Sequence, residues 1–224
     1  MKALLRPILV GLIEPVVFGL ITFLVAGTFD YWQAWLFLAV FAFSACISGV
    51  YLLRTHPDAL KRRMRAGPTA ETRTRQKAFI AGWYLSLVSA FVISALDHRF
   101  GWSQVPTAIC LIGNVLFALA LAMVTLVVIQ NSYAAAVVRV EEGQKLVSTG
   151  LYGLVRHPMY TGNVILILGI PLALGSYWGL LVLVPAVFVL ALRIRDEEKL
   201  LQDELDGYRE YTQEVPHRLV PGVW

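Results

Sequence analysis

Long apolar runs constrain this chain more than any other feature of its sequence. They cover roughly residues 8–27, 32–53, 79–96, 107–129 and 160–192. Four of them are close to the ~20 residues that a helix needs to cross a bilayer. With 58% hydrophobic and 15% charged residues and a mean hydropathy of +0.66, a soluble domain would expose much apolar surface. We therefore predict an all-α, polytopic integral membrane helical bundle of about five to six transmembrane helices.

The last apolar run is too long for one simple span. It is interrupted by Gly175-Ser-Tyr-Trp-Gly179, which is typical of a turn. We interpret residues 160–192 as a hairpin of two shorter helices, at about 161–174 and 178–192. One long kinked helix is the alternative.

The basic residues are distributed unevenly between the segments that join the runs. If the N-terminus is cytoplasmic, 18 of the 19 lysines and arginines are cytoplasmic, and only Arg99 falls outside. The positive-inside rule then predicts that both termini are cytoplasmic. This orientation needs an even number of crossings, which favours the hairpin. We expect a multi-pass protein of a bacterial-type inner or plasma membrane.

The segment 54–77 holds eight basic residues against Asp58 and Glu71. Such a segment is attracted to anionic lipid head groups by about 1 kcal/mol per basic residue near the surface. It has no aromatic residue on which a base could stack, which argues against nucleic acid as a partner. We interpret it as a basic cytoplasmic loop, with substrate binding as the alternative role.

Two regions follow from this organisation. Residues 1–129 would form four transmembrane helices with the basic loop 54–77. Residues 130–224 would form the motif region, with the helical hairpin 160–192 and a cytoplasmic C-terminal tail.

In the first region Glu14 lies inside an apolar run, where a carboxyl group costs several kcal/mol unless it is paired or protonated. It is therefore a candidate site residue, with a side chain that reaches the interface as the alternative.

Polar clusters flank the run 160–192, and a hairpin brings them to one membrane face. The first contains Arg156-His157-Pro158, and the second contains Arg193, Glu197 and Glu198. Pro158 suits the first turn of a helix, so His157 would lie at a helix N-terminus, where free N–H groups favour an anion. Arg193 and Glu197 are four residues apart and share a helical face. We also expect the last span to continue as an amphipathic helix over 193–214, with a stop near Gly207.

The order of these motifs resembles a known family. Gly-x-Tyr-x-x-x-Arg-His-Pro-x-Tyr-x-Gly, an apolar hairpin, Arg-x-x-x-Glu-Glu-x-x-Leu and Tyr-x-x-Tyr-x-x-x-Val follow one another over about 137–224. This order is similar to that of the isoprenylcysteine carboxyl methyltransferase family, whose wider group includes phospholipid N-methyltransferases. The resemblance implies a membrane methyltransferase with S-adenosyl-L-methionine as cofactor.

The resemblance also implies roles for single residues. Arg139 falls at a polar cofactor contact, and Arg193 falls where the family holds the substrate carboxylate. The implied cofactor pocket comprises Gln144, Lys145, Leu146, Val147, Tyr152, His157, Pro158, Met159, Tyr160 and Glu197.

The chemistry of methyl transfer is compatible with these roles. Displacement at a sulfonium methyl group needs alignment more than covalent help. A carboxylate acceptor is already ionised at pH 7, so Arg193 could orient it through its planar fork while Glu197 pairs with the cofactor. An amine acceptor would need a base, for which Glu198 or His157 is the first candidate.

Three functions remain open at this stage. The first is O-methylation of an isoprenylcysteine-like or other lipophilic carboxylate that enters from the bilayer. The second is N-methylation of a phospholipid or small amine, and the third is a non-enzymatic membrane transporter or assembly protein. Membrane lipids are the expected partners. We predict no metal, because the acidic residues lack tight ligand spacing and Cys46 and Cys110 are remote.

Overall fold

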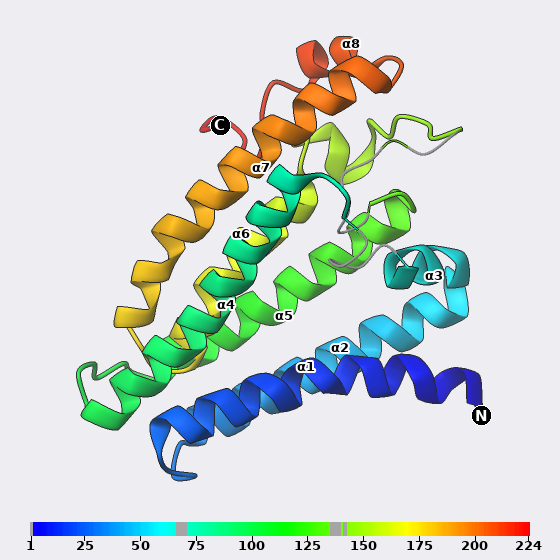
Figure 1. The fold of residues 1–224 in the computed structure, drawn as a ribbon. Helices are drawn as coiled ribbons and strands as arrows, with labels where there is room; N and C mark the ends of the chain where they lie inside the picture. Colours follow the sequence, from blue (N-terminus) through cyan, green and yellow to red (C-terminus); the bar gives the residue numbers. More distant parts are fainter. Residues whose placement is uncertain (1, 66–70, 135–139, 141–142) are drawn as a thin grey trace.

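The fold is a bundle of long helices, which lie close together at one end and spread apart toward the other (Figure 1). The computed structural model describes residues 2–65, 71–134, 140 and 143–224, and these residues contain no strand. The long helices are α1 (Lys2–Ala26), α2 (Trp32–Thr55), α4 (Thr74–Phe100), α5 (Thr107–Gln130), α6 (Pro158–Ala173) and α7 (Leu183–Glu204). The shorter elements are α3 (Pro57–Arg65), η2 (Gly150–Gly153), η3 (Trp178–Val182) and α8 (Tyr208–Glu214). The predicted all-α class is confirmed.

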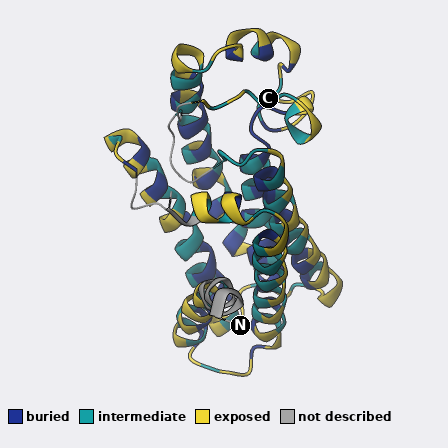
Figure 2. Ribbon diagram, turned by 90° about the vertical axis from the view of Figure 1, so that its right-hand side faces the viewer, coloured by how far each residue is buried: buried dark blue, intermediate teal, exposed yellow. Residues whose placement is uncertain are grey.

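The described helices have the length and apolar surface of membrane spans. Four qualify by length and hydropathy: α2, α4, α5 and the continuous stretch Trp178–Glu204. Gly11–Ala26 and Pro158–Ala173 are shorter apolar helices. Exposed residues line the outer faces of the bundle, where large side chains such as Leu24 and Val184 are 77% and 74% exposed (Figure 2). Apolar surface of this extent is suited to contact with lipid, and the chain is an integral membrane protein.

The run 160–192 folds as two helices joined by a turn. α6 ends at Ala173, just after Pro171, and α7 follows the short η3. Gly175 makes the turn with a φ of +73°, a left-handed conformation that glycine adopts without steric cost. The backbone is therefore a hairpin here, and no single kinked helix runs through this region.

Two expectations about the polar segments need correction. The segment 54–77 is more than a loop, because it contains α3 and the first turn of α4. Ala59 is buried while most charged side chains of α3 face outward, so an amphipathic helix forms there. The tail is two helices instead of one: α7 ends at Glu204, and Gly207, with a φ of +80°, precedes α8.

Small residues set the distance between α5 and α6. A Cβ atom on Gly113 would lie 2.3 Å from the backbone nitrogen of Ala173, and one on Gly169 would lie 3.0 Å from the carbonyl oxygen of Gly113. The two backbones therefore touch, as small residues allow in membrane bundles. Aromatic rings hold the other helices, since Phe18 of α1 stacks on Phe91 of α4 with ring centroids 4.3 Å apart.

A buried carboxylate joins the turns at the end of the bundle opposite the motif residues. Asp97 accepts hydrogen bonds from the backbone N–H and hydroxyl of Ser103 at 2.7 and 2.6 Å, and from the hydroxyl of Ser176 at 2.5 Å. The Tyr31 hydroxyl donates to the carbonyl of Leu174 at 2.6 Å. These bonds fix the α6–η3 turn against α2 and α4, and thereby the positions of α6 and α7.

Candidate functional site

The start of α6 positions the first polar cluster. Pro158 is the first helical residue and His157 precedes it, as predicted. The amide oxygen of Gln130, at the end of α5, accepts a hydrogen bond from the Leu151 N–H at 3.0 Å. The amide of Asn131 donates to the Tyr152 hydroxyl at 3.2 Å. The end of α5 thus holds η2 beside the start of α6.

One cavity lies at this end of the bundle, which we call the motif end. All ten of the residues predicted for the cofactor pocket line it. They come from the segment before η2, from η2 itself, from the start of α6 and from α7. The lining contains eight further residues, of which only Arg156 belongs to a predicted cluster: Asn131, Tyr133, Ala134, Arg156, Leu201, Leu205, Tyr208 and Tyr211. We call this space the motif-end cavity.

Four of the additional lining residues come from the chain after Glu197, where no pocket residue was predicted. Leu201 ends a quoted motif of α7, Leu205 follows α7, and Tyr208 and Tyr211 belong to α8 and to the last quoted motif. Their helical spacing was visible in the sequence, but it predicted a solvated amphipathic helix. Tyr211 fixes α8 in place, because its hydroxyl donates to the carbonyl of Tyr152 at 2.6 Å. Arg139, a weaker cofactor candidate, lies outside the described residues.

A hydrogen-bonded chain connects the cavity to the interior of the bundle. The Tyr160 hydroxyl donates to Glu197 Oε2 at 2.5 Å and accepts from Arg193 Nε at 2.8 Å. Tyr160 and Glu197 line the cavity, whereas Arg193 does not. Arg193 is 6% exposed and lies one hydrogen bond behind the cavity wall. Tyr160 of α6 therefore bridges Arg193 and Glu197, which share a helical face in α7.

Glu198 faces away from the cavity and binds three cationic or potentially cationic groups. Its Oε1 atom lies 2.8 Å from Arg156 Nε and 3.3 Å from His157 Nε2, and its Oε2 atom lies 2.8 Å from Arg218 Nε. The carboxylate side chain is 6% exposed. A carboxylate held by two guanidinium groups is kept ionised and has little tendency to take up a proton. Its contacts favour a role in positioning Arg156, His157 and the C-terminal segment.

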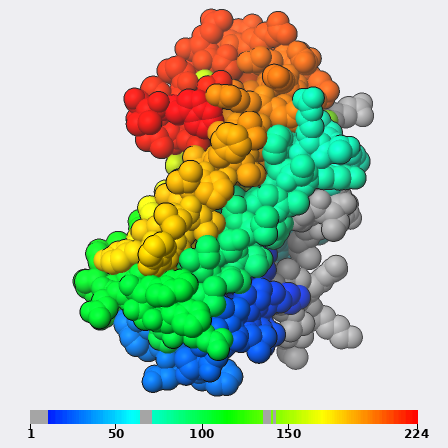
Figure 3. Space-filling model, turned by 60° about the vertical axis from the view of Figure 1, so that its left-hand side comes forward, coloured from blue at the N-terminus to red at the C-terminus, as the bar shows by residue number. Residues whose placement is uncertain are grey.

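The C-terminal segment packs along the start of α6. The backbone N–H groups of Arg156 and His157 donate to the carbonyls of His217 and Arg218 at 2.9 and 3.0 Å. The hydroxyl of Thr161 donates to the carbonyl of Leu219 at 2.8 Å. Figure 3 shows this segment in red against the orange α7. It therefore covers the side of the cluster that faces away from the motif-end cavity.

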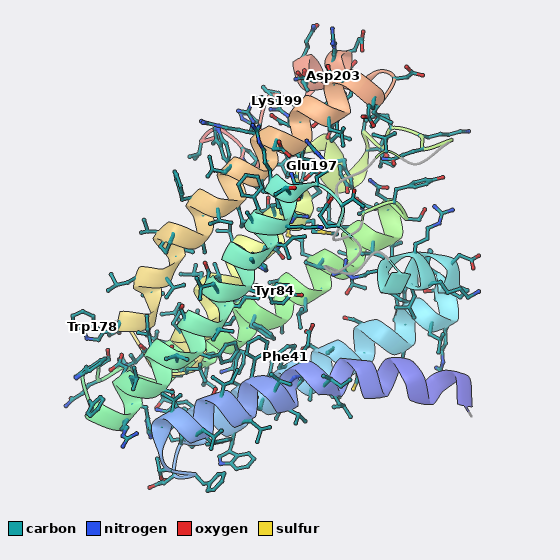
Figure 4. The ribbon with its side chains drawn as sticks, in the orientation of Figure 1. Phe41, Tyr84, Trp178, Glu197, Lys199 and Asp203 are labelled. Atoms are coloured by element: carbon teal, nitrogen blue, oxygen red, sulfur yellow. The ribbon has the colours of Figure 1, made fainter. Side chains whose placement is uncertain are left out.

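The cavity carries polar groups that suit a polar, partly cationic ligand. The Tyr208 hydroxyl is buried and has no hydrogen-bond partner among the residues that the structure describes, although Tyr208 lines the cavity. Burial raises the pKa of Tyr152 to about 12, so its phenol stays neutral at physiological pH. Of the charged lining residues, Arg156 is already paired with Glu198, which leaves Lys145 and Glu197 to meet a ligand. Figure 4 shows Glu197 at the motif end and Trp178 at the other end of the η3–α7 stretch.

Comparisons with known proteins found one family, two curated relatives and a solved structure to which the chain is similar. Residues 108–205 match the family described as phospholipid methyltransferase. The resemblance predicted from the motifs is thereby confirmed for the wider methyltransferase group. The match begins within α5, a helix that the sequence assigned to the scaffold, and ends before α8.

Two curated relatives match over shorter stretches. The chain is 37% identical over 89 residues to the Delta(14)-sterol reductase TM7SF2 of Mus musculus, a match that covers 37% of this chain and 20% of that protein. It is 34% identical over 83 residues to a probable 7-dehydrocholesterol reductase of Acanthamoeba polyphaga mimivirus, covering 36% and 19%. The chain thus spans about a fifth of the length of these relatives.

A solved structure covers nearly the whole chain. That structure is the eukaryotic intramembrane Ras methyltransferase, isoprenylcysteine carboxyl methyltransferase. Its alignment with this chain has a TM-score of 0.48 and 16% sequence identity. The alignment covers 99% of this chain and 95% of that one.

Proposed function

We propose that this chain, whose C-terminal region is related to the phospholipid methyltransferase family, is a methyltransferase that uses S-adenosyl-L-methionine. Its acceptor would be the carboxylate of an isoprenylcysteine-like or other lipophilic molecule that enters from the bilayer. The observation that carries the proposal is the motif-end cavity, because the ten residues that the family resemblance implies for the cofactor pocket line it together.

The cavity fits the chemistry of this cofactor. When bound, S-adenosylmethionine supplies a methyl group on a positively charged sulfonium, together with an ammonium, a carboxylate and ribose hydroxyls. Glu197 would accept from a cationic or hydroxyl group of the cofactor, and the free Tyr208 hydroxyl offers a further polar contact. Lys145 would pair with the cofactor carboxylate. Tyr152 and Tyr133 provide aromatic faces for a planar base.

Arg193 and Tyr160 would act on the acceptor side. Arg193 presents a planar fork that matches a carboxylate, and its bond to Tyr160 fixes the position of its Nε atom. Arg193 and Tyr160 would hold the acceptor carboxylate, and the bound cofactor would supply the methyl group. Transfer to a carboxylate would require no base, so positioning would be the role of these residues.

An amine acceptor is the alternative within the same enzyme class. It would require a base beside the methyl donor. Glu198 lies outside the cavity lining and is held by Arg156 and Arg218, so it is poorly placed to serve as one. His157 lines the cavity with its Nε2 3.3 Å from Glu198, so it is the candidate base for an amine. The placement of Glu198 favours the carboxylate acceptor, and an ester product, unlike an amine, is cleaved by mild base.

Reduction of a double bond is the second candidate function, since two sterol reductases share part of the sequence. A nicotinamide dinucleotide donor would bring several phosphate groups to the site. Such groups are normally held by several arginines, lysines or helix N-termini. Among the lining residues that the structure describes, Arg156 is paired with Glu198 and Lys145 is the other basic side chain. Charge therefore favours S-adenosylmethionine.

A cofactor titration distinguishes these functions. Calorimetry of detergent-purified protein should show saturable binding of S-adenosylmethionine or S-adenosylhomocysteine, and none of the reduced nicotinamide dinucleotide. Glu197→Ala and His157→Ala should weaken this binding by about tenfold to a hundredfold, because charge-assisted hydrogen bonds contribute about 1.5–3 kcal/mol each. Glu210→Ala, at an exposed site on α8, is the control. Folded wild-type protein that binds neither donor would favour the transporter or assembly role instead.

The proposed orientation follows from charge. The motif end carries the basic residues of α3, of the start of α4 and of the end of α7, so the positive-inside rule places it in the cytoplasm, where S-adenosylmethionine is made. The lipophilic acceptor and the membrane lipids would reach the site from the side, within the bilayer.

A further inference from the structure

A second cavity lies within the apolar half of the bundle, apart from the motif-end cavity. It has a volume of about 180 Å³ and is lined from α1, α2, α3 and α5. Its floor is made by buried Leu52, Val124 and Val128, while small residues of α1 and α2 leave it room. An engineered apolar cavity of about 150 Å³ stays dry and binds a benzene-sized hydrocarbon. We call this space the α3 cavity.

Arg63 is the charged residue of the α3 cavity lining. It belongs to α3, whose sequence contains four basic residues and one acidic residue, Asp58. Glu14 of α1 and Tyr84 of α4 interact electrostatically with its guanidinium. Figure 4 places Tyr84 partway along α4, away from the motif end. An arginine thus marks one side of a mainly apolar cavity, whose two hydroxyl residues, Ser48 and Thr125, bond each other at 3.0 Å.

The α3 cavity is separated from the motif-end cavity by a thin layer of side chains. Leu52 and Val128 line the α3 cavity and pack with Ala59 of α3 in one hydrophobic cluster. Met159 packs against the same cluster and lines the motif-end cavity. The guanidinium of Arg62 lies 4.5 Å above the ring of Tyr133, which also lines the motif-end cavity. α3 therefore contacts the walls of both spaces.

We propose that the α3 cavity binds an amphiphile with one hydrocarbon chain, which fills the cavity, and an anionic head group, which pairs with Arg63. The aliphatic floor excludes a polar occupant, because an unpaired polar group buried there would cost several kcal/mol. The excess of basic residues on α3 selects a negative head group.

Two molecules share this chemistry. One is an anionic phospholipid of the bilayer, and the other is the lipophilic carboxylate acceptor of the proposed methyl transfer. Only the second source rests on the proposed function, since a bilayer lipid would occupy the site whatever reaction the chain performs.

The test measures lipid binding by native mass spectrometry of purified protein with lysophosphatidylglycerol and lysophosphatidylcholine. Wild type should bind the anionic lipid about tenfold more tightly, and Arg63→Ala should abolish that preference. Ser48→Leu places an aliphatic side chain in the α3 cavity, while Thr125 keeps its bond to the carbonyl of Leu121. It should weaken binding of both lipids about tenfold. Two control variants should bind both lipids as wild type does. Ser48→Ala does not fill the cavity, and Arg195→Ala changes an exposed residue outside the lining.

Methyl transfer to a farnesylated cysteine with a free carboxylate then separates the two sources. If this acceptor occupies the α3 cavity, Ser48→Leu raises its KM about tenfold while the affinity for S-adenosylhomocysteine is unchanged. If a bilayer lipid occupies it, lipid binding is lost and the KM is unchanged. Unaltered lipid binding in both folded variants, Arg63→Ala and Ser48→Leu, would overturn the proposal. If S-adenosylmethionine does not bind, the proposed function fails, but the lipid-binding measurement still tests the α3 cavity.

Discussion

At the scale of single residues, Tyr160 contacts both the residue proposed to bind the cofactor and the residue proposed to bind the acceptor. Its hydroxyl bonds both Arg193 and Glu197, so Tyr160→Phe removes two contacts of one buried network. We expect lower affinity for the cofactor and a higher acceptor KM in the same variant, with losses of about tenfold each. Tyr177→Phe, at a half-exposed residue of the opposite end, serves as the control. An effect on the acceptor KM alone would mean that Glu197 keeps its position without Tyr160.

Arg193 and Glu197 should differ in their effects even though they share a helical face. Arg193→Ala should impair use of the acceptor more than binding of the cofactor, because Arg193 lies behind the cavity wall. Glu197→Ala should impair cofactor binding, because Glu197 forms part of that wall. Separate measurement of the S-adenosylhomocysteine affinity and the acceptor KM checks both. The reverse pattern would exchange the two roles and leave the enzyme class intact.

Asp97 offers a test of stability far from the proposed chemistry. Asp97→Ala would leave two donors of Ser103 and one of Ser176 without their acceptor in a largely buried place. Each unsatisfied buried group costs about 1–3 kcal/mol, so the melting temperature in detergent should fall by several degrees. Asp203→Ala, which removes a surface ion pair to Arg209, should change it little. Equal melting temperatures for the two variants would show that water replaces Asp97.

At the scale of elements, the contact between α5 and α6 leaves no room for a methyl group. Gly113→Ala would place a Cβ atom 2.3 Å from the backbone nitrogen of Ala173, and only movement of a whole helix could relieve this. Overpacking typically costs about 1–3 kcal/mol, so we expect a lower melting temperature. In Gly11→Ala the nearest atom lies at 3.7 Å, which makes it a matched helical control. A neutral Gly113→Ala would show that α5 and α6 can separate without cost.

The C-terminal segment should depend on Glu198. Glu198→Ala leaves the largely buried cations Arg156 and Arg218 without their carboxylate, and breaking such a pair from one side costs about 3–5 kcal/mol. Faster amide hydrogen exchange is expected at Arg156 and His157, whose N–H groups bond to His217 and Arg218. Exchange within α2 should stay unchanged. Protection retained at Arg156 and His157 would show that backbone pairing alone holds the segment.

The sequence predicted the helices well because apolar runs and bilayer thickness leave few choices. The residues that the resemblance implied for a cofactor pocket line one cavity, because His157, Pro158 and Glu197 lie in short local motifs at the ends of α6 and α7. The sequence missed the contribution of α8, since the left-handed turn at Gly207 returns the chain over the cavity, and helical spacing alone does not reveal such a turn. It could not predict the three partners of Glu198, because they come from positions far apart in the chain.

At the scale of the whole molecule, the two ends of the bundle should face opposite sides of the membrane. In a background with Cys46→Ser and Cys110→Ala, Asp30→Cys and Asp203→Cys would place single thiols at exposed positions of the two ends. If the motif end is cytoplasmic, a membrane-impermeant thiol reagent applied to intact cells should label Asp30→Cys and spare Asp203→Cys. After lysis both should react. The opposite pattern in intact cells would invert the proposed topology.

The Glu198 cluster also has a consequence for biosynthesis. Ribosomes deliver the N-terminal part of a chain first, at about 5–20 residues per second. When Glu198 has just been made, Arg156 and His157 already exist, whereas Arg218 and the cavity wall formed by Tyr208 and Tyr211 do not. The residues of α6 and most of α7 are therefore made before those that complete the motif-end cavity. A complete ligand site exists only after α8 and the C-terminal segment have left the ribosome.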